Sequence, residues 1–227
     1  MNHAGSGGRH RLRWVVKVGG SLSKNGALRR ALAQIERLSK AGFKIVVAPG
    51  GGEYADFIRR QSSLRRLDQL TTHQQAILSV RQFGLELAQA LPSGVAVRSC
   101  SEARARLREG ATPVFLPDER MTDDLAPIGW DTTSDTIAAA ILLRVGFGGL
   151  VLLKSMDGVE RHGRLAAVVP AAEAARVGVV DQAFPKVMRQ GWDVFILNGA
   201  KPGRLVELLE SGILTGTRLS ALPHGKR

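Results

Sequence analysis

Short apolar runs alternate with longer helix-like stretches along most of this 227-residue chain. The apolar runs have the length of buried strands, whereas stretches such as 27–40 and 70–90 have the length of helices. Parallel strands need crossover connections, which are usually helices, so this alternation predicts an α/β protein with a mainly parallel sheet. The chain is long enough for one core, and no internal repeat or linker divides it.

The first apolar run, residues 14–18, contains Lys17 and leads directly into Gly19, Gly20 and Ser21. Glycines let backbone N–H groups approach phosphate oxygens, and a lysine adds a charge that can follow a moving phosphoryl group. The segment therefore predicts a strand that ends in a phosphate-binding loop. A plain glycine turn after a strand is the alternative reading of the same residues.

A second glycine cluster follows the apolar run 43–48 and precedes a helix-like stretch that starts at Glu53. Its three glycines, Gly50, Gly51 and Gly52, are more than a turn needs, and they leave room for an anionic ligand at a helix N-terminus. Neither cluster matches the G-x-x-x-x-G-K-[ST] or G-x-G-x-x-G signatures. The common nucleotide-binding motifs are therefore excluded.

Further segments complete the pattern. They are Gly129 to Thr136 before an apolar helix at 137–143, the strand 149–153 followed by 154–159, the stretch 179–186, the strand-to-turn 193–199, and the closing segment 212–219. In this order the motifs resemble the amino acid kinase superfamily, over about residues 14–219. The resemblance implies a three-layer αβα sandwich with a mainly parallel sheet and an ATP-dependent kinase activity on a phosphate or carboxyl acceptor.

The resemblance also implies a single domain over residues 14–227, with acceptor binding in the N-terminal half and ATP binding in the C-terminal half. Residues 1–13 are small, polar and basic, and are expected to form a disordered tail. No segment approaches the length of a membrane span, and no export signal precedes the first strand, so a cytoplasmic location is expected. The family favours homodimers and larger rings.

Three residues are the catalytic candidates that the resemblance implies. Lys17 and Lys186 would hold the transferring phosphoryl group from two sides, and Asp135 would lie between them and orient both. Such a carboxylate keeps ammonium groups charged and aimed, a positioning role rather than general base catalysis. The alternatives are a surface lysine at 186 and a helix cap at Asp135, which Thr133 or Ser134 could also supply.

The nucleotide side is expected where the family binds ribose, phosphate and base. The candidates for ATP binding are Lys154, Ser155, Asp157, Gly158, Val159, Asn198 and Gly199. Mg²⁺ is expected as the companion of the ATP phosphates. The sequence contains no dedicated carboxylate cage, so the ion would be held largely by phosphate and water, without a protein metal site.

The acceptor is harder to assign. The chain has the length of the branch that converts (5-(aminomethyl)furan-3-yl)methyl phosphate to its diphosphate in methanofuran biosynthesis, within one-carbon metabolism, and resembles it around 49–56, 73–78 and 130–139. A uridylate, isopentenyl phosphate or acetylglutamate-like kinase, and a storage protein that binds nucleotide or oxyanion without catalysis, remain alternatives. The glycines at 50–52 would line the acceptor side, and the other candidate acceptor residues are Tyr54, Asp56, His73, Trp130, Asp131 and Ser134. A carboxylate would suit the ammonium of this acceptor and an aromatic side chain its furan ring.

The chain is strongly basic, with a formal net charge of +12 and a pI near 10.9. Nucleic-acid binding is nevertheless not expected, because the arginines are scattered and aromatic residues make up only 5% of the chain, too few for a stacking platform. A basic surface also attracts ATP and a phosphorylated acceptor. The single cysteine, Cys100, excludes an internal disulfide framework.

Overall fold

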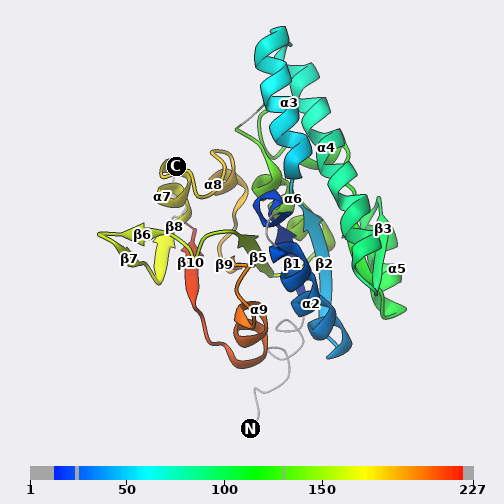
Figure 1. The fold of residues 1–227 in the computed structure, drawn as a ribbon, viewed down its shortest axis with the longest axis vertical. Helices are drawn as coiled ribbons and strands as arrows, with labels where there is room; N and C mark the ends of the chain where they lie inside the picture. Colours follow the sequence, from blue (N-terminus) through cyan, green and yellow to red (C-terminus); the bar gives the residue numbers. More distant parts are fainter. Residues whose placement is uncertain (1–12, 24–25, 130, 222–227) are drawn as a thin grey trace.

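The computed structural model describes residues 13–23, 26–129 and 131–221. Its core is an eight-stranded sheet in the order β3-β4-β2-β1-β5-β9-β10-β8, parallel except that β10 runs antiparallel to β9 (Figure 1). The strands are β1 (Arg13–Val18), β2 (Lys44–Pro49), β3 (Gly94–Val97), β4 (Thr112–Phe115), β5 (Gly149–Lys154), β8 (Val168–Pro170), β9 (Asp193–Asn198) and β10 (Gly216–Ser220). A separate hairpin joins β6 (Glu160–Arg161) to β7 (Arg164–Leu165).

Helices cover both faces of this sheet. They are α2 (Ala27–Lys40), α3 (Gly52–Arg65), α4 (Gln69–Ala90), α5 (Cys100–Arg108), α6 (Ser134–Val145), α7 (Ala171–Arg176), α8 (Phe184–Val187) and α9 (Arg204–Val206). Short 3-10 turns η1 (Gly20–Ser23) and η2 (Glu119–Thr122) and the π-helical turn η3 (Glu207–Ser211) complete the described structure. The predicted fold class, a three-layer sandwich with a mainly parallel sheet, is confirmed.

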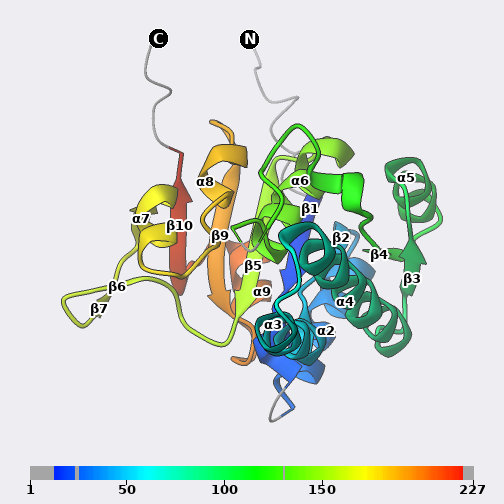
Figure 2. The same ribbon diagram turned by 90° about the horizontal axis from the view of Figure 1, so that it is seen from above.

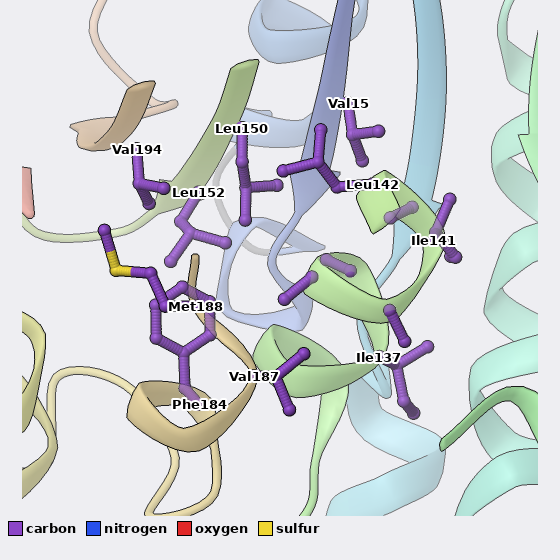
Figure 3. Packing of buried hydrophobic residues seen from close by; sticks show 14 of the residues in the cluster. Val15, Ile137, Ile141, Leu142, Leu150, Leu152, Phe184, Val187, Met188 and Val194 are labelled. Atoms are coloured by element: carbon purple, nitrogen blue, oxygen red, sulfur yellow. The ribbon is translucent and has the colours of Figure 1, made fainter. Parts of the chain in front are cut away.

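The helices divide between the two faces by their apolar side chains. In Figure 2, α6, α7 and α8 lie along one side of the sheet, and α2 and α9 lie on the other. Figure 3 shows the first side, where Leu142 of α6 lies beside Val15 of β1 and Leu150 of β5 belongs to the same cluster. Because both faces are covered, the strands are almost continuously apolar rather than alternating.

The sheet reverses its winding at β1. From this strand the chain builds β2, β4 and β3 on one side, and then returns to place β5 on the other side of β1. In open parallel sheets of this kind, ligands bind in the crevice beyond the carboxyl ends of the strands at the reversal point. That point lies where Lys17 and Val18 of β1 neighbour Leu152 and Leu153 of β5.

Most element boundaries agree with the sequence to within one or two residues. The predicted helix at 27–40 coincides with α2. The observed α4 begins at Gln69, one residue before the predicted start of the helix at 70–90. The strand β1 begins at Arg13, which the sequence had placed in the expected tail, and the rest of that tail, residues 1–12, lies outside the described residues. The apolar helix expected at 137–143 is longer, because α6 begins at Ser134 and ends at Val145. None of the helices in the described segments is long and apolar enough to cross a membrane.

Candidate active site

Lys17 is a lysine inside a buried strand, and the pleat decides which way it points. Trp14, Val16 and Val18 pack on the α2 side of the sheet, whereas Val15 packs on the α6 side. Successive side chains of a strand alternate between faces, so Lys17 shares the α6 side with Val15. Only 5% of Lys17 is exposed.

Asp135 in the first turn of α6 receives this ammonium group. Its Oδ1 atom lies 2.9 Å from Lys17 Nζ, and its Oδ2 atom lies 2.7 Å from Nζ of Lys154 at the end of β5. The side chain of Asp135 is only 6% exposed and that of Lys154 16%. We call these three residues the Lys–Asp–Lys triad. One buried carboxylate therefore holds two ammonium groups, and the triad carries a net charge of +1.

The second lysine of the triad differs from the sequence expectation. Asp135 was expected to orient Lys17 and Lys186, but the structure pairs it with Lys17 and Lys154. Lys186 lies in α8 and is exposed, and no ion pair to it occurs among the described residues. The physical reason is the register of β5, where Leu150, Leu152 and Lys154 alternate onto the α6 side beside Lys17.

The ion pairs set the protonation states of the triad. Burial, the largest influence, would raise the pKa of Asp135, but Lys17 and Lys154 together outweigh it and lower that pKa to about 2. Burial lowers the pKa of Lys17 below its ordinary value, while the neighbouring Asp135 acts in the opposite direction. Asp135 is thus a carboxylate at neutral pH and cannot serve as a proton donor there.

Asp181 anchors the helix that carries Asp135. The N-cap residue of α6, Thr133, makes no side-chain cap of its own, and Asp181 Oδ2 instead accepts hydrogen bonds from Thr133 N at 3.1 Å and Thr136 N at 3.0 Å. The alternative reading of Asp135 as a helix cap is therefore wrong. Sequence reasoning missed this role of Asp181, because capping by a residue 45 to 48 positions away leaves no local signal.

The two glycine clusters meet beside the triad. A Cβ atom on Gly20 would lie 2.4 Å from the backbone of Gly52, and one on Gly50 would lie 2.8 Å from the nitrogen of Gly20. The glycines therefore allow two loops to touch. Gly19 N donates to Leu153 O at 2.9 Å, so its N–H group is already used within the protein. Gly20 and Ser21, which line the adjacent cleft, are better placed for the predicted phosphate contacts.

A cleft of about 750 Å³ opens between these loops and helices α3, α4 and α6. Its walls include the sequence neighbours of the triad, Ser134 and Ser155, so the triad lies next to the cleft. The predicted acceptor residues that line it are Gly51, Gly52, Asp56, His73 and Ser134. Gly50 is buried beneath its neighbours.

The remaining acceptor candidates lie elsewhere. Tyr54 is half-buried, donates its hydroxyl to Glu86, and lines a separate hollow with Phe57 and Leu78. Asp131 is exposed, and its backbone carbonyl accepts from Ala183 N at 2.9 Å. Trp130 lies outside the described residues. The structure thus brings together only part of the predicted acceptor set.

His73 and Asp56 occupy opposite environments in the cleft wall. His73 is buried on α4, and its Nδ1 atom accepts a long hydrogen bond of 3.4 Å from Gly129 N. Burial lowers the pKa of His73, so this imidazole is neutral at physiological pH. Asp56 is exposed on α3 and pairs with Arg59 at 2.9 Å. Asp56 therefore supplies an accessible carboxylate, and His73 a neutral polar group.

The predicted nucleotide residues gather at the ends of β5 and β9. These neighbouring strands pair Lys154 with Asn198, and Gly199 N donates to Lys154 O at 2.9 Å. Ser155 is exposed and lines the cleft, whereas Asn198 is buried and uses its Oδ1 to accept from Ala200 N at 3.0 Å. The end of β5 and the end of β9 thus form one continuous edge beside the triad.

The loop after β5 is fixed by β10. Val159 N donates to Thr217 Oγ1 at 2.9 Å, and a Cβ atom on Gly158 would lie 2.3 Å from the same oxygen. Asp157 pairs with Arg204 at 3.2 Å. Of this predicted nucleotide segment, Gly158 and Val159 are buried, so in this structure their part is to shape the loop.

Among the residues that the structure describes, the site has features that suit a polyphosphate and no protein cage for a metal ion. The net positive triad and the close backbone approach of the glycine loops are the features that bind phosphate oxygens. In the segments that the structure describes, no cluster of three His, Cys, Asp or Glu residues could hold a metal. An Mg²⁺ ion that accompanies ATP would therefore be held mainly by phosphate oxygens and water.

Comparison with known proteins assigns this chain to a family. A model of the amino acid kinase family matches residues 12–198, so the chain belongs to that family. It is similar to the [5-(aminomethyl)furan-3-yl]methyl phosphate kinase of Methanocaldococcus jannaschii, with 25% identity over 202 residues that cover 86% of this chain and 92% of that protein. The chain is a phosphotransferase of this family.

Solved structures share the fold. The uridylate kinase of Archaeoglobus fulgidus superposes with a TM-score of 0.71 and 18% identity, covering 91% of this chain and 99% of that one. The UMP kinase of Bacillus anthracis gives a TM-score of 0.70 and 18% identity, covering 93% and 97%. At this level of identity the likeness establishes the architecture alone.

Proposed function

We propose that the protein transfers the γ-phosphoryl group of ATP to a phosphorylated small molecule, and that this acceptor is (5-(aminomethyl)furan-3-yl)methyl phosphate. The observation that carries the proposal is the Lys–Asp–Lys triad, buried at the carboxyl ends of β1 and β5 beside the cleft. The similarity to the [5-(aminomethyl)furan-3-yl]methyl phosphate kinase, aligned over 86% of this chain, supports the choice of acceptor.

The triad suits phosphoryl transfer because this reaction leaves little covalent work for the protein. The transition state spreads negative charge over the oxygens of the transferring group, so the need is for fixed positive charge and an in-line arrangement. Lys17 and Lys154 supply two ammonium groups held in place by Asp135. Because that arrangement exists before substrate binds, little reorganisation is needed during the reaction.

The two substrates would bind at opposite ends of the cleft. ATP with Mg²⁺ would lie along the ends of β5 and β9, near Ser155 and Asn198, with its terminal phosphate toward the triad and Gly20. The acceptor would lie between α3 and α4, where Asp56 can attract its ammonium group and His73 can contact it without a charge. Lys186 would contribute from the rim of the site, as the resemblance implies.

Tyr54, Trp130 and Asp131 stay predictions for this acceptor site. The hydroxyl of Tyr54 donates to Glu86, and Asp131 is exposed next to α6. The substitutions Tyr54→Phe and Asp131→Asn remove the hydroxyl and the charge respectively, so each tests one contact without removing bulk. A role in acceptor binding predicts a raised KM for the acceptor with kcat retained.

The test is Mg²⁺- and ATP-dependent ADP release with a panel of acceptors. The panel contains the furan phosphate, UMP, isopentenyl phosphate, acetylglutamate and aspartate, each measured with the wild-type protein and with Lys17→Ala. We expect turnover on the furan phosphate that is lost in Lys17→Ala while circular dichroism shows a retained fold. Turnover on another acceptor alone would contradict the proposed acceptor. ATP binding without turnover on any acceptor of the panel would contradict the proposed kinase activity on these compounds.

A further inference from the structure

Asp181 binds the starts of two helices at once. Its carboxylate accepts from the backbone and hydroxyl of Thr133 at 3.1 and 2.9 Å, from the backbone of Thr136 at 3.0 Å, and from the Thr136 hydroxyl. Its Oδ1 also accepts from Phe184 N at 3.0 Å. The first four bonds hold the beginning of α6, and the fifth holds the beginning of α8.

Both helices carry residues of the site. Asp135 lies between Thr133 and Thr136, so the hydrogen bonds to Asp181 flank the peptide that positions the triad carboxylate. Lys186 follows Phe184 by two residues in α8. A further tie, from Ala183 N to the carbonyl of Asp131 at 2.9 Å, joins the same two segments.

If the only role of Asp181 were to accept hydrogen bonds from the free N–H groups in the first turn of α6, an uncharged side chain would suffice. Serine, threonine or asparagine caps a helix about as well as aspartate does. A second carboxylate so near Asp135 is unfavourable by itself: burial raises the pKa of Asp181, and the charge of Asp135 raises it further. The hydrogen bonds from Thr136 and Thr133 act in the opposite direction and lower the pKa of Asp181. The charge of Asp181 in turn acts to raise the pKa of Lys17.

We propose that Asp181 is a positioning residue for phosphoryl transfer, which fixes Asp135 against Lys17 and Lys154 and joins α6 to the helix that carries Lys186. The proposal rests on the proposed function for its kinetic consequence, but its structural consequence can be measured without turnover. Loss of Asp181 lets the first turn of α6 shift, and Asp135 then no longer meets both ammonium groups.

The experiment compares three variants with the wild-type protein. Asp181→Asn removes the charge and replaces one accepting oxygen by an NH2 group, which would face the N–H groups either of Thr133 and Thr136 or of Phe184. Thr136→Val removes one hydroxyl donor and leaves every charge in place. Ser99→Ala is the matched control, since Ser99 Oγ caps α5 by accepting from Glu102 N at 3.1 Å, away from the triad.

The kinetic arm measures kcat and KM for ATP with the furan phosphate, together with the thermal midpoint of each variant. We expect Asp181→Asn to lower kcat by roughly 10- to 100-fold, as expected for a misplaced catalytic group, with a smaller fall for Thr136→Val. KM for ATP should change by less than about threefold. Ser99→Ala should lose thermal stability with kcat unchanged. A kcat that follows only the folded fraction in all three variants would reduce Asp181 to a structural cap.

The second arm follows the titration of Lys17 by NMR of protein labelled with ¹³C at lysine Cε, assigned by the signal missing in Lys17→Arg. We expect the pKa of Lys17 to fall further in Thr136→Val, where no charge has changed, because a weakened contact with Asp135 opposes the effect of burial less. An unchanged Lys17 titration in Thr136→Val and Asp181→Asn would overturn the proposal. Wild-type protein that turns over no acceptor would count against the proposed function alone, because the titration of Lys17 can be measured without turnover.

Discussion

Gly20 of the first glycine loop lies so close to Gly52 of the second that a Cβ atom on Gly20 would stand 2.4 Å from both the nitrogen and the Cα of Gly52. Nothing but backbone occupies this contact, so no flexible side chain can move aside. Both residues also line the cleft. The contact between the two loops therefore determines the shape of the wall at which phosphate groups are proposed to bind.

Gly20→Ala should consequently impair both the fold and the reaction. The added methyl group forces the two loops apart, and we expect kcat/KM to fall roughly tenfold or more because the site is displaced, with a lower thermal midpoint. Gly148→Ala is the control, since a Cβ atom there has no neighbour within 4 Å. ADP release and thermal melts of both variants give the answer, and an active, stable Gly20→Ala protein would contradict this explanation.

Lys154→Met and Lys186→Met should differ in how the stability of the protein depends on pH, which distinguishes the lysine that pairs with Asp135 from the one that does not. We expect both to lower kcat for ADP release, but only Lys154→Met removes an ammonium group that holds the pKa of Asp135 low. The loss of stability between about pH 5 and 2 should therefore shift to a smaller value in Lys154→Met than in the wild type, because the pKa of Asp135 in the folded variant lies closer to its ordinary value. Urea unfolding at several acidic pH values measures this, and an equal shift in Lys186→Met would contradict the observed pairing.

Acid should remove the stabilising contribution of Asp135. The pKa of Asp135 is lowered to about 2 in the folded protein, below the ordinary value of 3.8, so the folded state favours the carboxylate. This contribution is fully present above about pH 5 and is lost as the pH falls through about 4 to 2. Its size is on the order of 2 kcal/mol.

The measurement is the free energy of unfolding of the wild type and of Asp135→Asn between about pH 2 and 6. The advantage of the wild type over the amide variant should shrink steadily as the pH falls through this range. A constant difference would mean that Asp135 does not titrate in the way that its two lysine partners require.

Asp56→Asn should weaken binding of the acceptor without slowing the phosphoryl transfer step. Asp56 is an exposed carboxylate in the cleft wall, so we expect KM for the aminomethyl acceptor to rise roughly two- to fivefold, the effect of an exposed ion pair of up to about 1 kcal/mol. KM for ATP and kcat should stay the same. Steady-state kinetics with Asp118→Asn as control tests this, because Asp118 caps η2 instead. An unchanged acceptor KM would remove Asp56 from the site.

The sequence was informative wherever the signal is local. The bounds of α2 follow from a continuous helix-like stretch, and the position of β1 follows from an apolar run that ends in glycine. The family resemblance rested on the order of several such motifs, and the fold that it implied is confirmed. These features need no knowledge of which strands become neighbours.

The partner of Asp135 could not be predicted in the same way. Lys154 reaches Asp135 only because β5 lies beside β1 in a register that places Lys154 on the α6 side, and strand order is a property of the whole sheet. The capping role of Asp181 depends on contacts 45 to 48 residues apart. The contact between Gly20 and Gly52 is likewise visible only when two loops are placed together.

The alternation of β1 also affects how the protein assembles. A slip of β1 by one residue would turn Lys17 to the opposite side of the sheet, among the apolar side chains of Ala31 and Ile35 on α2. An ammonium group placed there would lose Asp135 and its solvation together, which costs several kcal/mol. Lys17, the residue proposed to bind the transferred phosphoryl group, thus also disfavours the nearest misfolded arrangement of the sheet and supports accurate strand pairing.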